Sequence, residues 1–544
     1  MSRSLEHAFQ KCRVSYEEII FSSIASALLV FYSKKALPFL QNMGVFLIIF
    51  GAFATVVGFA SLVFLLVSLY LFLLHKKYDH LPGPERASFF FGHIPLIKEN
   101  IMKGRELQEL LLEWSNRYDG VYVSWFGGWH PSVTLSHPDA LREAIIKYNL
   151  PKPVKFYQSM SEMFGVRFMK DGLVTIPYHE VWKKKRNAIN PAFFRSHLKT
   201  LISSFNQSCD LFIETLKPLA DGKTEVCMLD QFHRITMDVI MKVAFSLDLK
   251  TLDDKDSTFP KAVNKMLEAV MFRFRNPWHK YDPRTFKYQR EVANSLRMIR
   301  ETGRNCIAER QAAIVQGEEI PNDILSTIMK LELQESRELD IEELLDDFVT
   351  FFIAGQETTA NQLSFALLEI GLHPDITHKV VEEVDKVIGS HVDFVEYDDL
   401  ANLSYMTQVL KETLRKYPPA AGVIRHSPEE ITLNGHVIPA GTGIGLNIYG
   451  AHHNPTNWKD PEVFDPERFN AENAPNIKPF TFLPFSLGPR SCIGQHFAQF
   501  EAKVLLARFL QKFRIKLCPG QTTALRQTGT LQPRDGVMCL IEKR

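Results

Sequence analysis

Residues 484–499 read PFSLGPRSCIGQHFAQ, a stretch that places a single cysteine, Cys492, between two glycines and ahead of an amphipathic segment, 497–509. Gly488 and Gly494 allow a tight loop and the close approach of a flat partner. The helix predicted behind the loop points backbone amides and the positive end of its dipole at the sulfur, which favours a thiolate. Such a sulfur can be a packing residue, half of a disulfide, a nucleophile or a metal ligand.

The composition is that of an ordinary globular chain. Its 544 residues are 45% hydrophobic and 23% charged, enough for three or four domains or for one large core with a tether. Lysine and arginine number 63 and aspartate and glutamate 62, for a net charge of +1. This balance lacks the basic footprint of a nucleic-acid-binding protein, so we expect no nucleic-acid partner.

The cysteines argue against a disulfide framework. The chain has seven, widely scattered and with no CxxC spacing, which suits a reducing compartment. For six of them the expected role is that of a small buried hydrophobe or an inert thiol: Cys12, Cys209, Cys227, Cys306, Cys518 and Cys539. Cys492 differs from them by its neighbours.

The N-terminal region predicts a membrane anchor. Residues 43–74 contain no charged residue, and this run is longer than the ~20 residues that a helix needs to cross a bilayer. We therefore expect a transmembrane anchor over 43–76 behind an N-terminal extension, 1–42. A weaker apolar stretch, 19–32, favours an interfacial segment but leaves a second span open.

The charges and prolines after the anchor suggest its orientation and its end. Lys76 and Lys77 favour the cytoplasmic side for the downstream flank, although Lys34 and Lys35 upstream compete. The prolines of LPGP stop a helix, which predicts a proline-rich hinge over 77–84. Residues 85–544 show no repeat or long linker and are expected to form one catalytic domain.

Helical patterns dominate this domain. Residues 341–372 carry a long apolar pattern that opens on acidic residues and ends at His373-Pro374, which predicts one long helix. The run ITLNGHVI, 431–438, predicts a hairpin with an Asn-Gly turn. The expected fold is therefore mainly α with small β-sheets.

The spacing of Phe485, Gly488, Arg490, Cys492 and Gly494 favours the ligand role for the cysteine. A thiolate held in this way can be the axial ligand of haem iron, where it favours cleavage of the O–O bond. The stretch resembles the haem-thiolate signature of the cytochrome P450 family, which implies the fold of that family and places Phe485 and Gly488 beside the cofactor.

Independent motifs carry the same resemblance. The ETLR motif places Glu412 and Arg415 three residues apart on one helix face, where such a pair is most often a solvated salt bridge. Together with PERF, which contains Arg468, it resembles the buried triad that supports the haem region in P450 enzymes.

The motif AGQETT lies within the long predicted helix. By itself it is equally well a polar surface turn of that helix. In the P450 pattern, Ala354 borders the cofactor and Gly355 lets the helix open beside bound oxygen. Glu357 and Thr358 then resemble the acid and alcohol that relay protons, and they are the expected catalytic residues.

Four further residues are candidates for holding the haem propionates. Trp182 and Arg186 match the WxxxR motif of the family, and Arg425 and Arg490 are similar candidates because guanidinium suits a carboxylate. The neighbouring lysines 183–185 form either a solvated face or a docking surface for an acidic reductase.

The substrate pocket is less clearly marked. An aromatic and methionine stripe is more often core than ligand-facing, and here it comprises Phe156, Tyr157, Met160, Phe164 and Phe168. Position in the P450 pattern adds Phe351, Ala354, Ala420 and Thr530. Ala421 stands at a pocket position where the resembled family carries a bulky aromatic.

Three longer runs narrow the resemblance to the cholesterol 24-hydroxylases among P450 enzymes: KYDHLPGP, FVTFFIAGQETTANQLSF and LPFSLGPRSCIGQHFAQFEAKV. This implies a monooxygenase that contains haem b and hydroxylates cholesterol at C24. It implies electrons from NADPH through NADPH-cytochrome P450 reductase, and a place in the endoplasmic reticulum membrane with the catalytic domain on the cytoplasmic side. The alternatives are a P450 acting on fatty acids or xenobiotics and a non-catalytic haem sensor or carrier.

Overall fold

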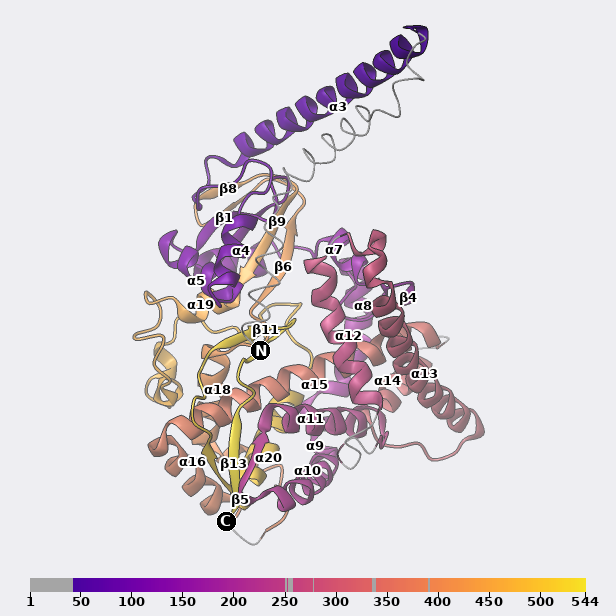
Figure 1. Ribbon diagram of the computed structural model, residues 1–544. Coiled ribbons are helices and arrows are strands. Elements are labelled where there is room, and N and C mark those ends of the chain that lie inside the picture. Colours follow the sequence, from indigo (N-terminus) through magenta and orange to yellow (C-terminus); the bar gives the residue numbers. More distant parts are fainter. Residues whose placement is uncertain (1–42, 250–251, 253–257, 277, 335–338, 390–391) are drawn as a thin grey trace. The chain divides into compact units, whose positions relative to one another are not determined.

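The helix predicted over 341–372 forms with those bounds as α15 (Ile341–Leu372) and runs through the larger part of the structure (Figure 1). Oδ1 of Asp340 caps its first turn by accepting the backbone N–H of Glu342 at 2.9 Å and of Glu343 at 3.1 Å. His373, in an extended conformation before Pro374, ends it. Helices α11, α13, α18 and α20 pack around α15, so most of its residues are buried.

This computed structural model describes residues 43–544 apart from 250–251, 253–257, 277, 335–338 and 390–391. The N-terminal extension and the apolar stretch within it lie outside the described residues. Contacts divide the chain into two units, one ending at Lys76 and one running from Lys77 to Arg544.

The described part of the first unit is helix α3 (Met43–Tyr78), which continues into the start of the second. Within the described residues, Phe50–Tyr78 is the one helix long and apolar enough to cross a membrane, and protein covers few of its side chains. This helix is the candidate membrane anchor that the sequence predicted.

The segment predicted as a hinge, 77–84, begins within α3, belongs to the second unit and packs inside it. The backbone N–H of Val123 donates to the carbonyl of Pro82 at 2.8 Å. A Cβ added to Gly83 would lie 2.6 Å from the carbonyl oxygen of Val123, so glycine permits this close approach. The chain after Lys77 therefore lies packed along strand β1 (Val121–Trp125).

Helices make up most of the second unit, as expected. Besides α15, they are α4 (Ile94–Met102), α5 (Leu107–Arg117), α6 (Pro138–Arg142), α7 (Val154–Ser159), α8 (His179–Ile189), α9 (Arg195–Thr200), α10 (Ile202–Leu216), α11 (Met228–Phe245), α12 (Thr258–Arg275), α13 (Phe286–Gln316), α14 (Ile324–Gln334), α16 (Pro374–Val387), α17 (Asp399–Asn402), α18 (Ser404–Lys416), α19 (Ile448–His453) and α20 (Gln495–Lys512).

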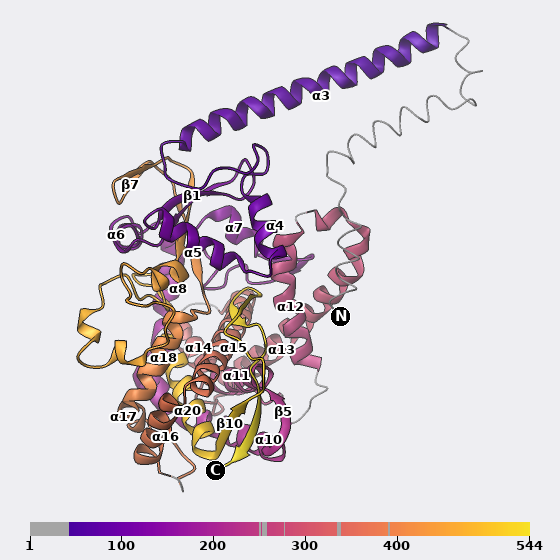
Figure 2. The same ribbon diagram turned by 60° about the vertical axis from the view of Figure 1, so that its left-hand side comes forward.

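The β-structure is limited to small sheets. Four strands pair in the order β1-β2-β9-β6, with β2 and β9 parallel, and three in the order β10-β13-β5. Figure 2 shows the second of these sheets beside α10 and the C-terminus. The other strands are β2 (Pro131–Leu135), β3 (Glu162–Met163), β4 (Val166–Arg167), β5 (Asp221–Cys227), β6 (Gly422–Ser427), β7 (Ile431–Leu433), β8 (His436–Ile438), β9 (Thr442–Asn447), β10 (Phe513–Leu517), β11 (Leu525–Gln527), β12 (Leu531–Pro533) and β13 (Met538–Lys543).

The predicted hairpin over 431–438 is confirmed as β7 and β8. Ile431 pairs with Ile438 and Leu433 with His436. The turn residues Asn434 and Gly435 both have positive φ, at 45° and 80°, as a two-residue hairpin turn requires.

The predicted buried triad also forms. Arg415 makes a bidentate pair with Glu412, with both N–O distances 2.8 Å and both side chains fully buried. Nε of Arg468, from the short turn Pro466–Phe469, lies 3.3 Å from Oε1 of Glu412. One carboxylate thus joins α18 to a segment more than fifty residues further along the chain.

The triad is connected to the cysteine loop through His452 of α19. Arg415 donates to the carbonyl of His452 at 3.0 Å, and Nε2 of His452 accepts the backbone N–H of Leu483 at 2.9 Å. Burial, together with the nearby Arg415, lowers the pKa of His452 to about 3, so the imidazole stays neutral and can accept this bond. Leu483 directly precedes the stretch 484–499.

This arrangement predicts a large stability loss when one partner of the triad is removed. Glu412→Gln leaves Arg415 buried without a counter-charge, which is expected to lower the free energy of unfolding by about 3–5 kcal/mol. Chemical unfolding in detergent, followed by tryptophan fluorescence, measures it. Glu99→Gln breaks the exposed Lys103–Glu99 pair and serves as the control, with no measurable change expected. Equal midpoints for the two variants would contradict the structural role of the triad.

Candidate active site

The loop that carries Cys492 is fixed by its own backbone. The N–H of Cys492 donates to the carbonyl of Phe485 at 2.9 Å, and the N–H of Ser491 to that of Gly488 at 3.1 Å. Gly488 has a φ of 74°, and a Cβ there would lie 2.9 Å from Cγ2 of Ile145. Glycine is therefore required at this turn for both conformation and space.

The side chain of Cys492 is exposed to a cavity of about 330 Å³ inside the body of the protein. All six cysteines among the described residues are free, which leaves Cys492 without a disulfide partner there. Gly494 has an ordinary φ of −81°, and a Cβ there would meet only the sulfur of Cys492, at 3.9 Å. Neither packing nor backbone strain thus explains this second glycine, and the space beside the sulfur suits a flat group.

The amide of Gly494, at the start of α20, favours the thiolate of Cys492 as the sequence predicted, but it is not the largest influence on the pKa of this thiol. Burial raises the pKa of the Cys492 thiol, and the amide of Gly494 and the guanidinium of Arg186 only partly oppose it. A coordinating metal cation deprotonates a thiol outright, so ligation can supply what the helix does not.

Of the three arginines predicted to hold carboxylates, Arg186 and Arg490 line this cavity, and Arg425 lies close enough to Arg490 to affect its charge. Arg186 donates to the carbonyl of Ser491 at 2.9 Å, and Arg490 to that of Ile176 at 2.9 Å. The guanidinium carbon of Arg490 lies 3.9 Å from the ring centre of Trp182, which is itself buried. Arg425 is buried and donates to the neighbouring carbonyl of Ile424.

A fourth cation, Lys152, was not predicted. It lines the same cavity, and its Nζ donates to the carbonyl of Val174. Burial, together with Arg490 and Arg425, holds the pKa of Lys152 well below its usual value. No motif marks this residue, and its only local signal is that Pro151 and Pro153 enclose it.

These four cations lack a carboxylate partner among the described residues. Every ion pair that the structure shows lies elsewhere, although burial makes unpaired charge costly. Burial and the nearby Arg425 lower the pKa of Arg490 to about 10. The cavity thus offers one soft sulfur ligand and a cluster of cations that needs an anion, which fits a haem with its two carboxylates.

Helix α15 forms another wall of the cavity. Ala354 and Thr358 line it, and the Thr358 hydroxyl donates to the carbonyl of Ala354 at 2.8 Å. A Cβ at Gly355 would lie 2.9 Å from Cδ1 of Ile240, so this glycine allows α11 to pack closely against α15. That packing role was not predicted from the motif.

Glu357 lies on a different side of α15 from Thr358. It does not line the cysteine cavity but borders a second cavity, and its Oε1 accepts the Thr530 hydroxyl at 2.8 Å. Burial raises the pKa of Glu357 to about 7, with the Thr530 hydrogen bond opposing. The side chains of the two residues predicted to act as a pair therefore line different cavities.

Only some of the residues predicted to line the substrate pocket line the cysteine cavity. Phe351, Ala354 and Ala420 line the cysteine cavity, whereas Thr530 bonds Glu357 instead. Ala421 is buried in the core and does not line this cavity. None of the aromatic and methionine stripe lines this cavity, and the favoured core interpretation is confirmed for the residues in or against the core: Met160, Phe164 and Phe168.

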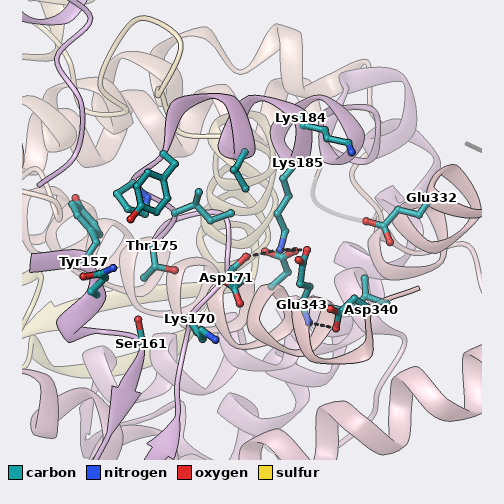
Figure 3. A pocket seen from close by; sticks show the side chains of 17 residues that line it. Tyr157, Ser161, Lys170, Asp171, Thr175, Lys184, Lys185, Glu332, Asp340 and Glu343 are labelled. Atoms are coloured by element: carbon teal, nitrogen blue, oxygen red, sulfur yellow. Dashed lines mark hydrogen bonds and ion pairs between the residues drawn. The ribbon is translucent and has the colours of Figure 1, made fainter. Parts of the chain in front are cut away.

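The lysines after Trp182 do not form one face. Lys183 and Lys184 are exposed, but Nζ of Lys185 lies 2.8 Å from Oδ2 of buried Asp347. Figure 3 shows Lys185 reaching from α8 toward Glu343 while Lys184 points elsewhere. Lys184 and Lys185 line a further cavity, of about 510 Å³, together with acidic residues such as Asp347. This cavity is larger than the one at Cys492, but no cysteine lines it.

Comparisons with known proteins agree with this site. The family model described as cytochrome P450 matches residues 82–540. Human cytochrome P450 4F8 is 31% identical over 454 residues, covering 80% of this chain and 85% of that protein. Mouse leukotriene-B4 omega-hydroxylase 3 is 29% identical, covering 88% and 93%, and human ultra-long-chain fatty acid omega-hydroxylase is 29% identical, covering 85% and 88%.

The names of these relatives do not support the sterol substrate expected from the sequence. They refer to leukotriene B4 and to ultra-long-chain fatty acids where they name a substrate. The match over nearly all of the second unit, together with a cysteine loop, a cation cluster and a buried triad that fit haem, establishes the wider assignment. The chain belongs to the cytochrome P450 family.

Proposed function

We propose that this P450 monooxygenase hydroxylates the hydrocarbon end of a long-chain fatty acid or a related lipid acid. The observation that carries the monooxygenase chemistry is the sulfur of Cys492, which opens into a cavity whose cations lack a carboxylate. The substrate class is supported by the names of the omega-hydroxylase relatives. Family membership implies a haem with thiolate-bound iron and electrons from NADPH through a reductase.

The residues of the cavity hold the cofactor in this proposal. Cys492 would supply the sulfur ligand, and Arg186, Arg425, Arg490 and Lys152 would pair with the haem carboxylates. Trp182 stacks on Arg490 and keeps its guanidinium in place. Bound haem supplies the activation of dioxygen and the oxidation of a C–H bond.

The reaction requires controlled proton delivery. One oxygen atom enters a C–H bond and the other leaves as water, which consumes two protons and two electrons from NADPH. The Thr358 hydroxyl hydrogen is directed to Ala354, so its oxygen can accept a hydrogen bond from the cavity side. We assign Thr358 the role of orienting the proton donor there, and Glu357 that of an acid within the same helix.

The apolar lining suits a hydrocarbon chain. Phe193, Ile240, Phe351 and Val423 form an apolar part of the cavity wall, beside the cations and polar side chains such as Gln362. Such a wall excludes water and holds an aliphatic end without directing it by hydrogen bonds.

A sterol side chain is the second candidate substrate. It rests on the three runs that resemble cholesterol 24-hydroxylases, two of which contain the AGQETT motif and the cysteine loop. Fatty acid chains and sterol side chains share the same reacting group, an aliphatic C–H bond.

The cellular setting follows from the anchor and the family. Helix α3 would hold the protein in the endoplasmic reticulum membrane, with the catalytic domain on the cytoplasmic side. The reductase would dock where Lys183 and Lys184 are exposed, because acidic partners are attracted to such a patch. Lys185 takes no part in this surface, since its charge is paired with Asp347.

Turnover with two substrates tests the proposal. The purified full chain, reductase and NADPH are expected to convert a long-chain fatty acid to an omega-hydroxylated product and to leave cholesterol largely unchanged. Mass spectrometry against hydroxylated standards assigns the product. Hydroxylation of cholesterol at C24 without fatty acid oxidation would replace the main proposal by the second candidate, and oxidation of neither would reject both.

The ligand assignment predicts a spectroscopic loss. Cys492→Ala should abolish the shifted absorption band that marks a thiolate-bound, reduced carbon monoxide complex, because no other sulfur faces the cavity among the described residues. Cys518→Ala, a partly exposed thiol elsewhere, is the control and should keep the band. A band that survives in Cys492→Ala would remove this residue from the ligand role.

The role of Thr358 predicts uncoupling. In Thr358→Ala most of the NADPH consumed should no longer appear as hydroxylated product but as peroxide, since protons are no longer oriented. Thr358→Ser keeps a hydroxyl and should restore coupling. Thr407→Ala is the matched control, because Thr407 also bonds the carbonyl four residues back but does not line the cavity. Unchanged coupling in Thr358→Ala would contradict the assignment.

A further inference from the structure

A second cavity, of about 470 Å³, lies between α11, α12 and the β11–β12 hairpin and is bordered by Glu357 of α15. The residues at its rim on these elements are exposed, so it opens to solvent, whereas Glu357 is only 5% exposed. The other charged or titratable groups that line it are Asp230, His233, Arg234, Lys261, Glu268 and Arg526. Glu357 is thus the buried end of a water-accessible, polar space.

A chain of side-chain hydrogen bonds ends on the carboxyl of Glu357. The Thr530 hydroxyl lies 2.8 Å from Oε1 of Glu357, and Nδ2 of Asn361 donates to that hydroxyl oxygen, also at 2.8 Å. Nε2 of His233 lies 3.3 Å from Oδ1 of Asn361. Nε2 of Gln356 completes the chain at 2.7 Å from Nδ1 of His233.

The donor-to-acceptor direction of this series of hydrogen bonds is fixed at Gln356, the end furthest from Glu357. Nε2 of Gln356 also donates to the backbone carbonyl of His233 at 3.3 Å, which settles the orientation of the amide. Nδ1 of His233 must then accept. Burial lowers the pKa of His233, so the ring is neutral and carries its hydrogen on Nε2. Each following donor therefore points toward Glu357.

The direction of these hydrogen bonds shows that the side chains hold the Glu357 carboxyl in position but do not pass protons to it. Asn361 carries an amide, which can give and accept hydrogen bonds but does not exchange protons readily, so the chain holds Glu357 without feeding it protons. Helix α15 and its neighbours bury the rest of the carboxyl. The second cavity is a space open to solvent that this acid borders.

We propose that solvent protons reach Glu357 through the second cavity, and that His233, Asn361 and Thr530 are positioning residues that hold its carboxyl at the inner end. The inference rests on the proposed monooxygenase function, in which Glu357 is the acid of α15. It adds a place of proton entry and three residues that no motif in the sequence marked for this role.

The hydrogen bond from Thr530 is tested by titrating Glu357 itself. Infrared difference spectra of the full-length holoenzyme, taken across pH and assigned with Glu357→Gln, give the midpoint of its carboxyl band. A hydroxyl that donates to a carboxylate stabilises the charged form, so Thr530→Val should raise the midpoint by about half to one pH unit. Thr530→Ser should leave it in place, as should Thr528→Val, whose side chain lines the same cavity but makes no hydrogen bond to Glu357 that the structure shows.

The route is tested by closing the cavity. Asn264, an exposed residue of α12, lines it, and Asn264→Trp should slow the exchange of the Glu357 carboxyl hydrogen for deuterium at least several-fold. Thr258→Trp, an exposed position on the same helix outside the cavity, is the control. Both variants should keep the thiolate carbon monoxide band, which shows that the fold and the haem site are intact.

The two infrared experiments can contradict this inference whatever the result of the turnover experiment. An unchanged midpoint in Thr530→Val would remove the positioning chain, and unchanged exchange in Asn264→Trp would remove the cavity as the route. Neither result depends on product formation. Absence of any oxidised lipid would instead reject the proposed function, even with both infrared results as expected.

Discussion

The ion triad centred on Glu412 is the constraint on which the site depends. Its carboxylate is fully buried and holds Arg415 of its own helix and Arg468 from a later segment. A buried charge that loses its partner is strongly unfavourable, so the three segments cannot separate without a large cost. Through His452 the same network reaches Leu483 and hence the loop of Cys492. The position of the sulfur is therefore set by charges that do not face the cavity.

Unlike the triad, in which Glu412 balances the arginines, the cysteine cavity has cations without a balancing carboxylate. Of the four cations, Arg425 is buried and Lys152, Arg186 and Arg490 are half-buried. None has a carboxylate partner among the described residues, which a protein tolerates poorly unless an anion arrives. Burial likewise raises the pKa of the Cys492 thiol. The protein thus presents a soft ligand and a positive cluster that are both satisfied by the same cofactor, and haem binding and stability are expected to be coupled.

Helix α15 separates two spaces with different roles. Thr358 faces the cysteine cavity, while Glu357, the preceding residue, faces the solvent-connected one. Adjacent residues on a helix point about 100° apart, so a motif read as a contiguous pair can serve two sides. The acid and the alcohol of AGQETT are an example of neighbours in sequence that the fold places in different environments.

The sequence by itself determined the local features: the bounds of α15, the Asn-Gly hairpin, the candidate anchor helix and the family motifs. These depend on capping, turn conformation and apolar length, which are properties of short segments. It also marked Cys492, the triad and the arginines, because their spacing is fixed. Only the tertiary structure decided that Lys152 joins the cations, that Lys185 pairs with Asp347, that Ala421 is core and that Glu357 faces a second cavity. These facts depend on which distant segments pack together, and on how burial balances charge once they do.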